Sequence, residues 1–267
     1  MSAAASTTLD RAAGHISDLD APTNLIITGT ADDLRTRWTT GDRAEWCHMG
    51  QDEVSTWDGV TLRSTYSDKA IEGRDKLANA ARDGDWSTVL DLLEAHPGWI
   101  NSGRVSGSSW YAPLHQVAWH GADADIAHRL VAYGAWRTLR TAQEERALDI
   151  ADRRGHHHLL VPLTPVVHHP LPAETLRSIQ RHFHLLIHDR ADDLITDHQL
   201  RLPELEPLTE QQNPACWFAV PGMYGGFSYR LSGAELTVES WSRIAGGSGQ
   251  RHVIDEHGAR LVAEGFV

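Results

Sequence analysis

Histidines are the side chains best suited to chemistry in this sequence, and their spacing first suggests a metal ion. The chain has 17 histidines, and nine of them fall between His156 and His198. His184 and His188 are four residues apart on an expected helix, a spacing at which two imidazoles can hold one metal ion. However, the sequence has no H-E-x-x-H motif, and His182, His184 and His188 do not share one face with a suitably spaced carboxylate. We therefore expect no metal site and no cofactor.

A second group of candidate residues lies in the glycine-rich text near the end of the chain. Alternation along an expected strand puts Glu239, Trp241 and Arg243 on one face, where they could line a small pocket or face the helical part. The glycine run just before His252 could offer backbone N–H groups to an anion, although it lacks the lysine and following helix of a phosphate-binding loop. Glycines this dense are also typical of hairpin turns. The candidates are Glu239, Arg243 and His252 for catalysis, and Tyr224, Trp241, Ser248 and Arg251 for ligand binding.

Nucleophilic catalysis finds little support in the sequence. The only cysteines, Cys47 and Cys216, are far apart and form no C-x-x-C pattern, so we expect free thiols. His48 follows Cys47 directly, and adjacent residues do not orient a base on a thiol. There is no G-x-S-x-G motif. These observations favour a protein that is not an enzyme.

Charge and hydropathy exclude two classes of partner. The chain has 36 acidic and 24 basic residues, a net charge of −12, and no run of basic residues, so it lacks the footprint of a nucleic-acid-binding protein. No segment approaches the roughly 20 apolar residues that span a bilayer. Residues 1–20 lack the apolar core of a signal peptide. We expect a cytoplasmic protein, and the preference for arginine over lysine indicates a GC-rich bacterial genome.

Three segments of the chain superimpose on one another. They are residues 76–84, 113–121 and 147–155, and their closing glycines are 37 and 34 residues apart. Pro113 stands at a first helical position, where its missing N–H costs no hydrogen bond. Each glycine is followed by a second run with apolar residues at helical spacing. The pattern predicts three pairs of antiparallel helices that must stack to form a shared core.

These segments resemble the ankyrin repeat, which has a period of about 33 residues and a T-P-L-H-like start to its first helix. Residues 112–135 match best, and the resemblance covers residues 72–164, about a third of the chain. Ala112 in place of the usual threonine and a long loop at 101–111 depart from the pattern. The resemblance implies an α-solenoid of about three repeats, a structural role for His115, and recognition of another protein.

The resemblance also implies where a partner would bind. Ankyrin-like units present a concave face built from loop tips and first helices. Exposed tryptophan, tyrosine and arginine are enriched where binding energy concentrates. The alternative for Trp110 and Trp136 is burial against the long loop or the N-terminal segment. The candidate partner-binding residues are Arg82, Asp83, Trp110, Tyr111, Trp119, His120, Trp136, Arg153 and Arg154.

The rest of the chain completes an α+β fold: a short ankyrin-like α-solenoid with a small C-terminal antiparallel β-domain. We expect a flexible leader at 1–22, and at 23–71 a segment that matches no known module and could cap the repeats. Residues 165–212 should hold one amphipathic helix, which caps the repeats or joins them to the next part, followed by an extended linker. Short runs separated by glycine turns predict an antiparallel meander of four or five strands at 213–267.

The sequence thus predicts a bacterial cytoplasmic protein that recognises another protein through the concave face of its repeats. The net negative charge favours a basic partner through electrostatic steering, and an inhibitor or immunity factor is one form of this hypothesis. The alternative is an enzyme or small-ligand sensor with a pocket formed by the β-domain against the repeats.

Overall fold

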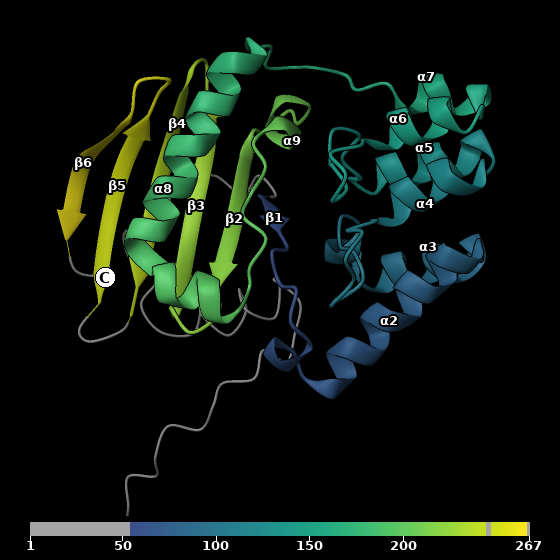
Figure 1. Cartoon of the computed structure of the whole chain (residues 1–267), viewed down its shortest axis with the longest axis horizontal. Helices are drawn as coiled ribbons and strands as arrows, with labels where there is room; N and C mark the ends of the chain where they lie inside the picture. Colours follow the sequence, from purple (N-terminus) through teal and green to yellow (C-terminus); the bar gives the residue numbers. More distant parts are fainter. Residues whose placement is uncertain (1–53, 244–246, 266–267) are drawn as a thin grey trace, which may run out of the picture.

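Short paired helices and a six-stranded sheet lie side by side in this chain (Figure 1). The computed structural model describes residues 54–243 and 247–265, and within them it has eight α-helices. The expected α+β class is confirmed. The expected leader at 1–22 and most of the segment at 23–71 lie outside the described residues. No helix in the described ranges is long and apolar enough to cross a membrane.

Three consecutive pairs of helices make up one unit, which we call the helical unit. Its first helices end where the repeated glycines stand: Gly84 and Gly121 take left-handed conformations, with φ of 76° and 62°, which a side chain would strain. Pro113 begins its helix without a lost hydrogen bond. The pairs are α2 (Asp68–Asp83) with α3 (Trp86–Ala95), α4 (Pro113–His120) with α5 (Ala124–Ala132), and α6 (Ala147–Arg153) with α7 (Leu160–Leu163).

The helical unit is held together by small and branched residues from neighbouring pairs. Ala118 and Ala151 are fully buried, so α4 and α6 can approach closely, and α4 also packs on α2. The fully buried His115 joins consecutive pairs: its Nδ1 accepts from the N–H of Ala112 (3.1 Å), and its Nε2–H donates to the carbonyl of Leu139 (3.0 Å). Burial lowers the pKa of His115 to about 4, so the imidazole is neutral and serves structure.

The sheet has its strands in sequence order. Five of them form the antiparallel meander that the glycine turns predict, and a sixth from the N-terminal segment pairs parallel to β2, which the sequence did not indicate. Their bounds are β1 (Ser55–Trp57), β2 (Ala215–Val220), β3 (Gly225–Ser232), β4 (Glu235–Ser242), β5 (Ser248–Ile254) and β6 (Ala259–Gly265).

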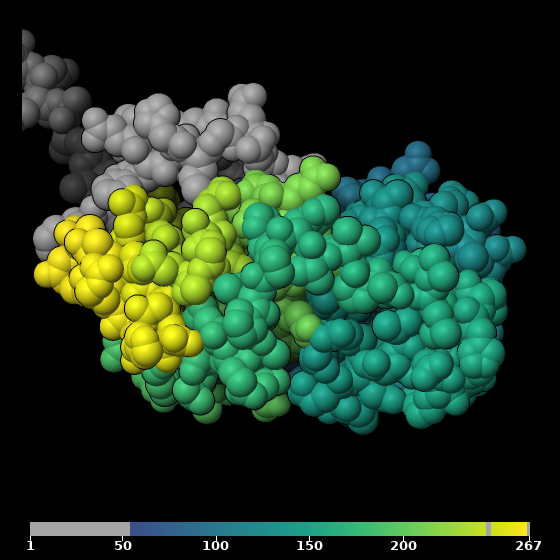
Figure 2. Space-filling model, turned by 90° about the horizontal axis from the view of Figure 1, so that it is seen from above, coloured from purple at the N-terminus to yellow at the C-terminus, as the bar shows by residue number. Residues whose placement is uncertain are grey.

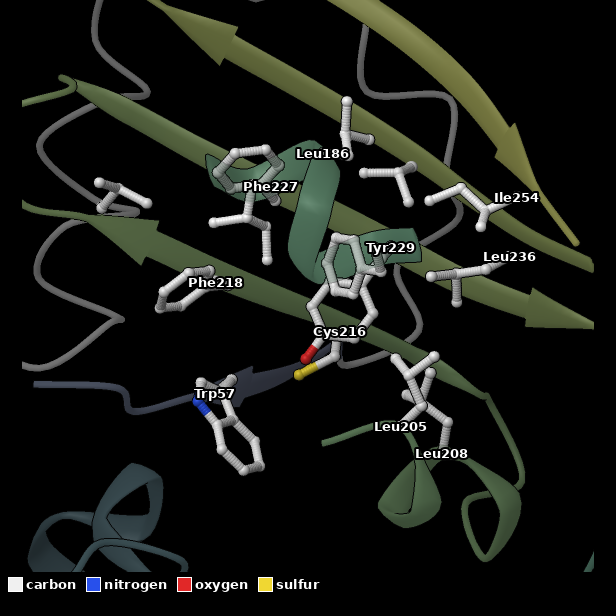
Figure 3. Packing of buried hydrophobic residues seen from close by; sticks show 14 of the residues in the cluster. Trp57, Leu186, Leu205, Leu208, Cys216, Phe218, Phe227, Tyr229, Leu236 and Ile254 are labelled. Carbon is white, nitrogen blue, oxygen red and sulfur yellow. The ribbon is translucent and has the colours of Figure 1, made fainter. Parts of the chain in front are cut away.

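One long helix, α8 (Ala173–Asp197), covers one face of the sheet (Figure 1). Its apolar side chains, Phe183 among them, join a core with Phe227 and Tyr229 of the sheet, so the helix belongs to the sheet and does not cap the repeats. Figure 3 shows this core from close by. The helix is kinked at Ala191, whose φ and ψ are −153° and 28°.

A buried polar cluster attaches the N-terminal segment to the helical unit. The carboxylate of Asp58 pairs with Arg74 of α2 and accepts hydrogen bonds from Tyr66 (2.9 Å) and Ser102 (2.8 Å). The Arg74 guanidinium also lies 4.5 Å from the ring centre of Tyr66. Burial raises the pKa of Asp58, but Arg74 and the two hydroxyls lower it more, so the carboxylate stays ionised.

The sheet and its helix α8, which together we call the sheet unit, meet the helical unit along a broad seam (Figure 2). Trp57 of β1 stacks on Trp136 of the helical unit at 5.9 Å between ring centres, and Arg201 lies over Trp57 at 5.0 Å. Residues 200–213, expected as a linker, instead contain the buried turn α9 (Glu206–Thr209). Glu206 of that turn pairs with Arg140 and Arg146 in the loop before α6.

Candidate functional site

The first helices of the three pairs end side by side on one surface. Six of the predicted partner-binding residues lie there, two at each helix end, and all six are exposed. Because α4 packs between α2 and α6, these ends form a continuous line. We call this surface the helix-end row, and it consists of Arg82, Asp83, Trp119, His120, Arg153 and Arg154.

Trp119 is the centre of the helix-end row. The residue is 38% exposed and is one of the large hydrophobic residues that the described chain presents at its surface. The guanidinium of Arg154 lies 3.9 Å from its ring centre, and the ring of Tyr111 meets it edge-on at 6.2 Å. A cation above one face and an aromatic edge beside it hold the indole in one orientation. The ring is thus both exposed and fixed in place.

The neighbours of Trp119 are held by further contacts. Arg153 forms an ion pair with Glu145 at 2.8 Å. His120 donates from Nε2 to the carbonyl of Arg82 at 2.8 Å and meets the ring of Trp86 edge-on at 5.9 Å. His120 is therefore exposed and at the same time joins α4 to α2. The sequence did not single out Glu145, because nothing local relates it to a residue eight positions later.

A small cavity of about 230 Å³ opens beside the helix-end row, which contributes Arg82 to its lining. Leu77 and Ala81 of α2 give it an apolar wall, and Gln116 of α4 and Arg104 of the long loop are polar groups at its edge. A cavity of mixed polarity next to an exposed aromatic ring is a place where one side chain of a partner can be inserted.

The two tryptophans of the loops, Trp110 and Trp136, point toward the interior. The prediction that they bind a partner is therefore corrected. Trp136 is 7% exposed and stacks on Trp57, so its face is already occupied. Trp110 is half-buried, with the guanidinium of Arg201 4.5 Å from its ring centre. For Trp136 the structure agrees with the alternative of burial against the N-terminal segment. Tyr111 is half-buried and supports Trp119 from the side.

The candidate residues of the sheet do not form the expected joint pocket. The strand register pairs Glu239 with Arg251 and Val238 with His252, so His252 lies on the opposite face from Glu239 and Trp241. Glu239 is bound to Arg251 in an ion pair at 2.6 Å. The predicted grouping of Glu239, Arg243 and His252 as a catalytic set is therefore wrong.

The four ligand-binding candidates of the sheet are also dispersed. Trp241 stacks on Trp217 at 4.5 Å between ring centres, on the face away from α8. Tyr224 is exposed in the turn between β2 and β3, with a φ of 51°. Arg251 is on the same face as Trp241 but is bound to Glu239, and Ser248 bonds to Arg190 of α8. These side chains do not converge on one point.

Two histidines of α8 and the buried cysteine have contacts that are typical of structural residues. His184 donates from Nε2 to the carbonyl of Pro203 (2.8 Å), and His188 bonds to Asp192 (2.7 Å). Within the described ranges, no three potential metal-ligating side chains lie together. Burial raises the pKa of Cys216 to about 12, so its thiol is not ionised. Figure 3 shows it beside the hydroxyl of Tyr229. Cys47 lies outside the described residues.

Comparison with known proteins gives little further information. No protein-family model matches the chain, and no curated protein matches it. Among solved structures, it is similar to one chain of the complex of a predatory endopeptidase from Bdellovibrio bacteriovorus with an immunity protein, at 23% identity and a TM-score of 0.28. The match covers 33% of this chain and 42% of that chain. So weak a likeness carries no argument about fold or function.

Proposed function

We propose that this protein binds another protein through the helix-end row, and that residues 72–164 are repeats of the ankyrin type. The observation that carries the proposal is the exposed ring of Trp119, fixed between Arg154 and Tyr111. A ring that is already oriented loses little conformational freedom when a partner covers it. Tryptophan and arginine are also the residues that most often dominate binding energy.

The assignment to the ankyrin type is supported by local features of the helical unit. Three helix pairs follow one another, with their first helices adjacent, and two of those helices end on left-handed glycines. His115 bonds the backbone of its own helix start and of the following loop. This is the structural role that the resemblance implies for the histidine of the helix-start motif.

The alternative function, an enzyme or ligand sensor with a pocket between the sheet and the repeats, gains less support. The seam is filled by the stacked rings of Trp57 and Trp136 and by Arg201. The candidate catalytic side chains are on opposite faces of the sheet. A surface for a macromolecule fits the described residues better than a closed pocket for a substrate.

The charge of the helix-end row refines the kind of partner segment that we expect to bind there. The expectation of a basic partner, such as the target of an inhibitor or immunity factor, rests on the net charge of −12. In the helix-end row, however, Arg82 pairs with Asp83 and Arg153 with Glu145, whereas Arg154 has no ion pair among the described residues and leaves a positive charge beside Trp119. We propose that a partner attracted by the whole molecule places a locally acidic or aromatic segment against the row.

Affinity capture with the full chain tests the proposal. The test variant is Trp119→Ala/Arg154→Ala, and His120 is left unchanged because it joins α4 to α2. The control is Tyr133→Ala, a similarly exposed aromatic residue at the end of the second helix α5. A captured partner is then purified and its Kd measured. We expect the double variant to bind at least about 30-fold more weakly while it remains folded at the assay temperature, and the control to bind normally. Equal affinity of the double variant and the wild type would refute the proposal.

A further inference from the structure

The inner face of the sheet, which α8 covers, changes from apolar to polar at one end. Over β2 and β3 it carries large rings such as Phe218 and Phe227. The antiparallel register of β4 and β5 then places a patch of hydroxyl, amide and imidazole groups on the same face. The polar patch consists of Ser240, Ser242, Ser248, Gln250 and His252.

Several polar atoms at this place are buried without a hydrogen-bond partner. The hydroxyl of Ser240 and Nδ1 of His252 are two of them, and their residues are only 2% and 8% exposed. The third is Nε of Arg190, which reaches the patch from α8. Since buried polar groups in proteins nearly always have a partner, three unsatisfied atoms on facing elements point to a bound group.

Arg190 supplies the charge at this place. Its Nη2 donates to the hydroxyl of Ser248 at 3.0 Å, which directs the guanidinium onto the sheet. In the part of the chain that the structure describes, no carboxylate forms an ion pair with it. Asp189, its neighbour in sequence, is exposed, and its charge acts on Arg190 without an ion pair between the two side chains. The kink at Ala191 directly follows Arg190.

We infer that the chain binds a small oxyanion, of the phosphate, sulfate or carboxylate class, between the kink of α8 and strands β4 and β5. Arg190 provides the positive charge, and Ser240 and His252 provide hydrogen-bond donors. All three unsatisfied groups can donate to an anion, since neutral imidazole can carry its proton on Nδ1. Charge-assisted hydrogen bonds of this kind are about twice as strong as neutral ones.

An internal water molecule is the competing occupant. Water would satisfy the hydroxyl and the imidazole, because a buried water typically makes about three hydrogen bonds. It would not compensate the guanidinium, and a partly buried charge without a counter-ion is costly. The missing counter-charge therefore favours an anion. The inference is independent of partner binding at the helix-end row, which lies on the other unit.

Isothermal titration calorimetry on the full chain tests this site. The protein is titrated with sodium phosphate, sodium sulfate and sodium acetate at constant ionic strength set by chloride. We expect saturable binding, and the ranking of the three anions identifies the class. Arg190→Gln should weaken binding at least about tenfold. The matched control is Arg181→Gln, an exposed arginine of the same helix that bonds only to Ser178 among the described residues, and it should bind normally.

The outcomes separate the anion from water. If the wild-type chain shows no saturable heat at millimolar concentrations of any of the three anions, the inference is overturned and the polar atoms are hydrated. Binding by Arg190→Gln with wild-type affinity overturns it as well. If Arg190→Gln does not fold, Ser240→Ala replaces it: its Tm in chloride should match the wild type, while the rise in Tm caused by phosphate should be reduced. An undiminished rise in Ser240→Ala contradicts the site.

Discussion

The buried pair of Asp58 and Arg74 should be the most sensitive single contact between the N-terminal segment and the helical unit. The perturbation is Asp58→Asn, which keeps the shape of the side chain and removes its charge. Tyr66 and Ser102 donate to different oxygens of Asp58, so the single amide oxygen of asparagine keeps only one of these two hydrogen bonds. What changes is that the guanidinium of Arg74 loses its counter-charge while it stays enclosed by Tyr66 and Trp99.

The magnitude follows from the burial of the pair. The side chains of Arg74 and Asp58 are 8% and 16% exposed, so little solvent screens the lost charge. Breaking a buried pair by removing one partner costs about 3–5 kcal/mol, because the other charge remains uncompensated. Because Asp58→Asn keeps the shape of the side chain and one of the two hydrogen bonds, we take the lower end of this range, about 3 kcal/mol. For a domain of this size, about 3 kcal/mol lowers Tm by roughly 6–12 °C.

Urea denaturation followed by circular dichroism measures this cost. The control is Asp83→Asn, which removes the partner of Arg82 in a pair whose side chains are 59% and 60% exposed, and it should leave the midpoint unchanged. The pH dependence adds a second readout. The pKa of Asp58 is lowered in the folded state. Its contribution to the stability of the fold is therefore complete above the pKa of the unfolded chain, and it is lost as the pH falls through the lowered pKa of the folded state. The difference between wild type and Asp58→Asn should therefore shrink in acid.

Two results would contradict the role of Asp58 as the counter-charge of Arg74. If Asp58→Asn destabilises the chain no more than Asp83→Asn does, the Asp58 carboxylate does not compensate a buried charge. The cluster would then be solvated and the N-terminal segment held by apolar contacts alone. The second result is a loss of stability in Asp58→Asn that is the same at all pH values. The wild-type carboxylate loses its charge in acid, so the difference between the two proteins should become smaller there.

Two further predictions concern single buried groups. The pKa of His115 is lowered to about 4 from its ordinary value near 6.5, so the unfolded chain binds more protons between these values; stability should fall by about 3 kcal/mol as the pH drops through this window. In His115→Gln this part of the pH dependence, measured by urea denaturation, should disappear, and an unchanged slope would contradict the assignment. In a Cys47→Ser background, Cys216 should react with iodoacetamide only as fast as the chain unfolds, because burial raises the pKa of its thiol to about 12; fast labelling of the native protein, measured by mass spectrometry, would show an accessible thiolate.

Features that repeat locally could be predicted from the sequence. The glycines at 84 and 121 end helices because a left-handed residue is needed there, and glycine takes that conformation without strain. The alternation in residues 213–267 with glycine turns likewise predicts an antiparallel meander, in which neighbouring strands are joined by short loops. Both patterns lie within a few residues, so the local sequence carries the information.

Contacts between distant segments could not be predicted in this way. Strand β1 has three residues and pairs Trp57 with Phe218, far along the chain, and three residues are too few to show a period. The faces of the sheet were assigned by alternation within each strand, but the relative register of β4 and β5 decides that Glu239 and His252 are on opposite sides. Arg190 was overlooked for a similar reason, since its contact is with a strand 58 residues later.

The position of the sheet determines which part of the helical unit is left for a partner. The loop tips at Trp110 and Trp136 point into the seam, where β1 and residues 200–210 cover them. The helix ends at Arg82, Trp119 and Arg154 are not covered by the described parts of the sheet unit. The candidate aromatic residues of the helical unit are thus divided between two tasks. Those on the loops bind the chain's own sheet, and the one on α4 stays exposed, so recognition is expected to depend on the row while the seam fixes how the two units are joined.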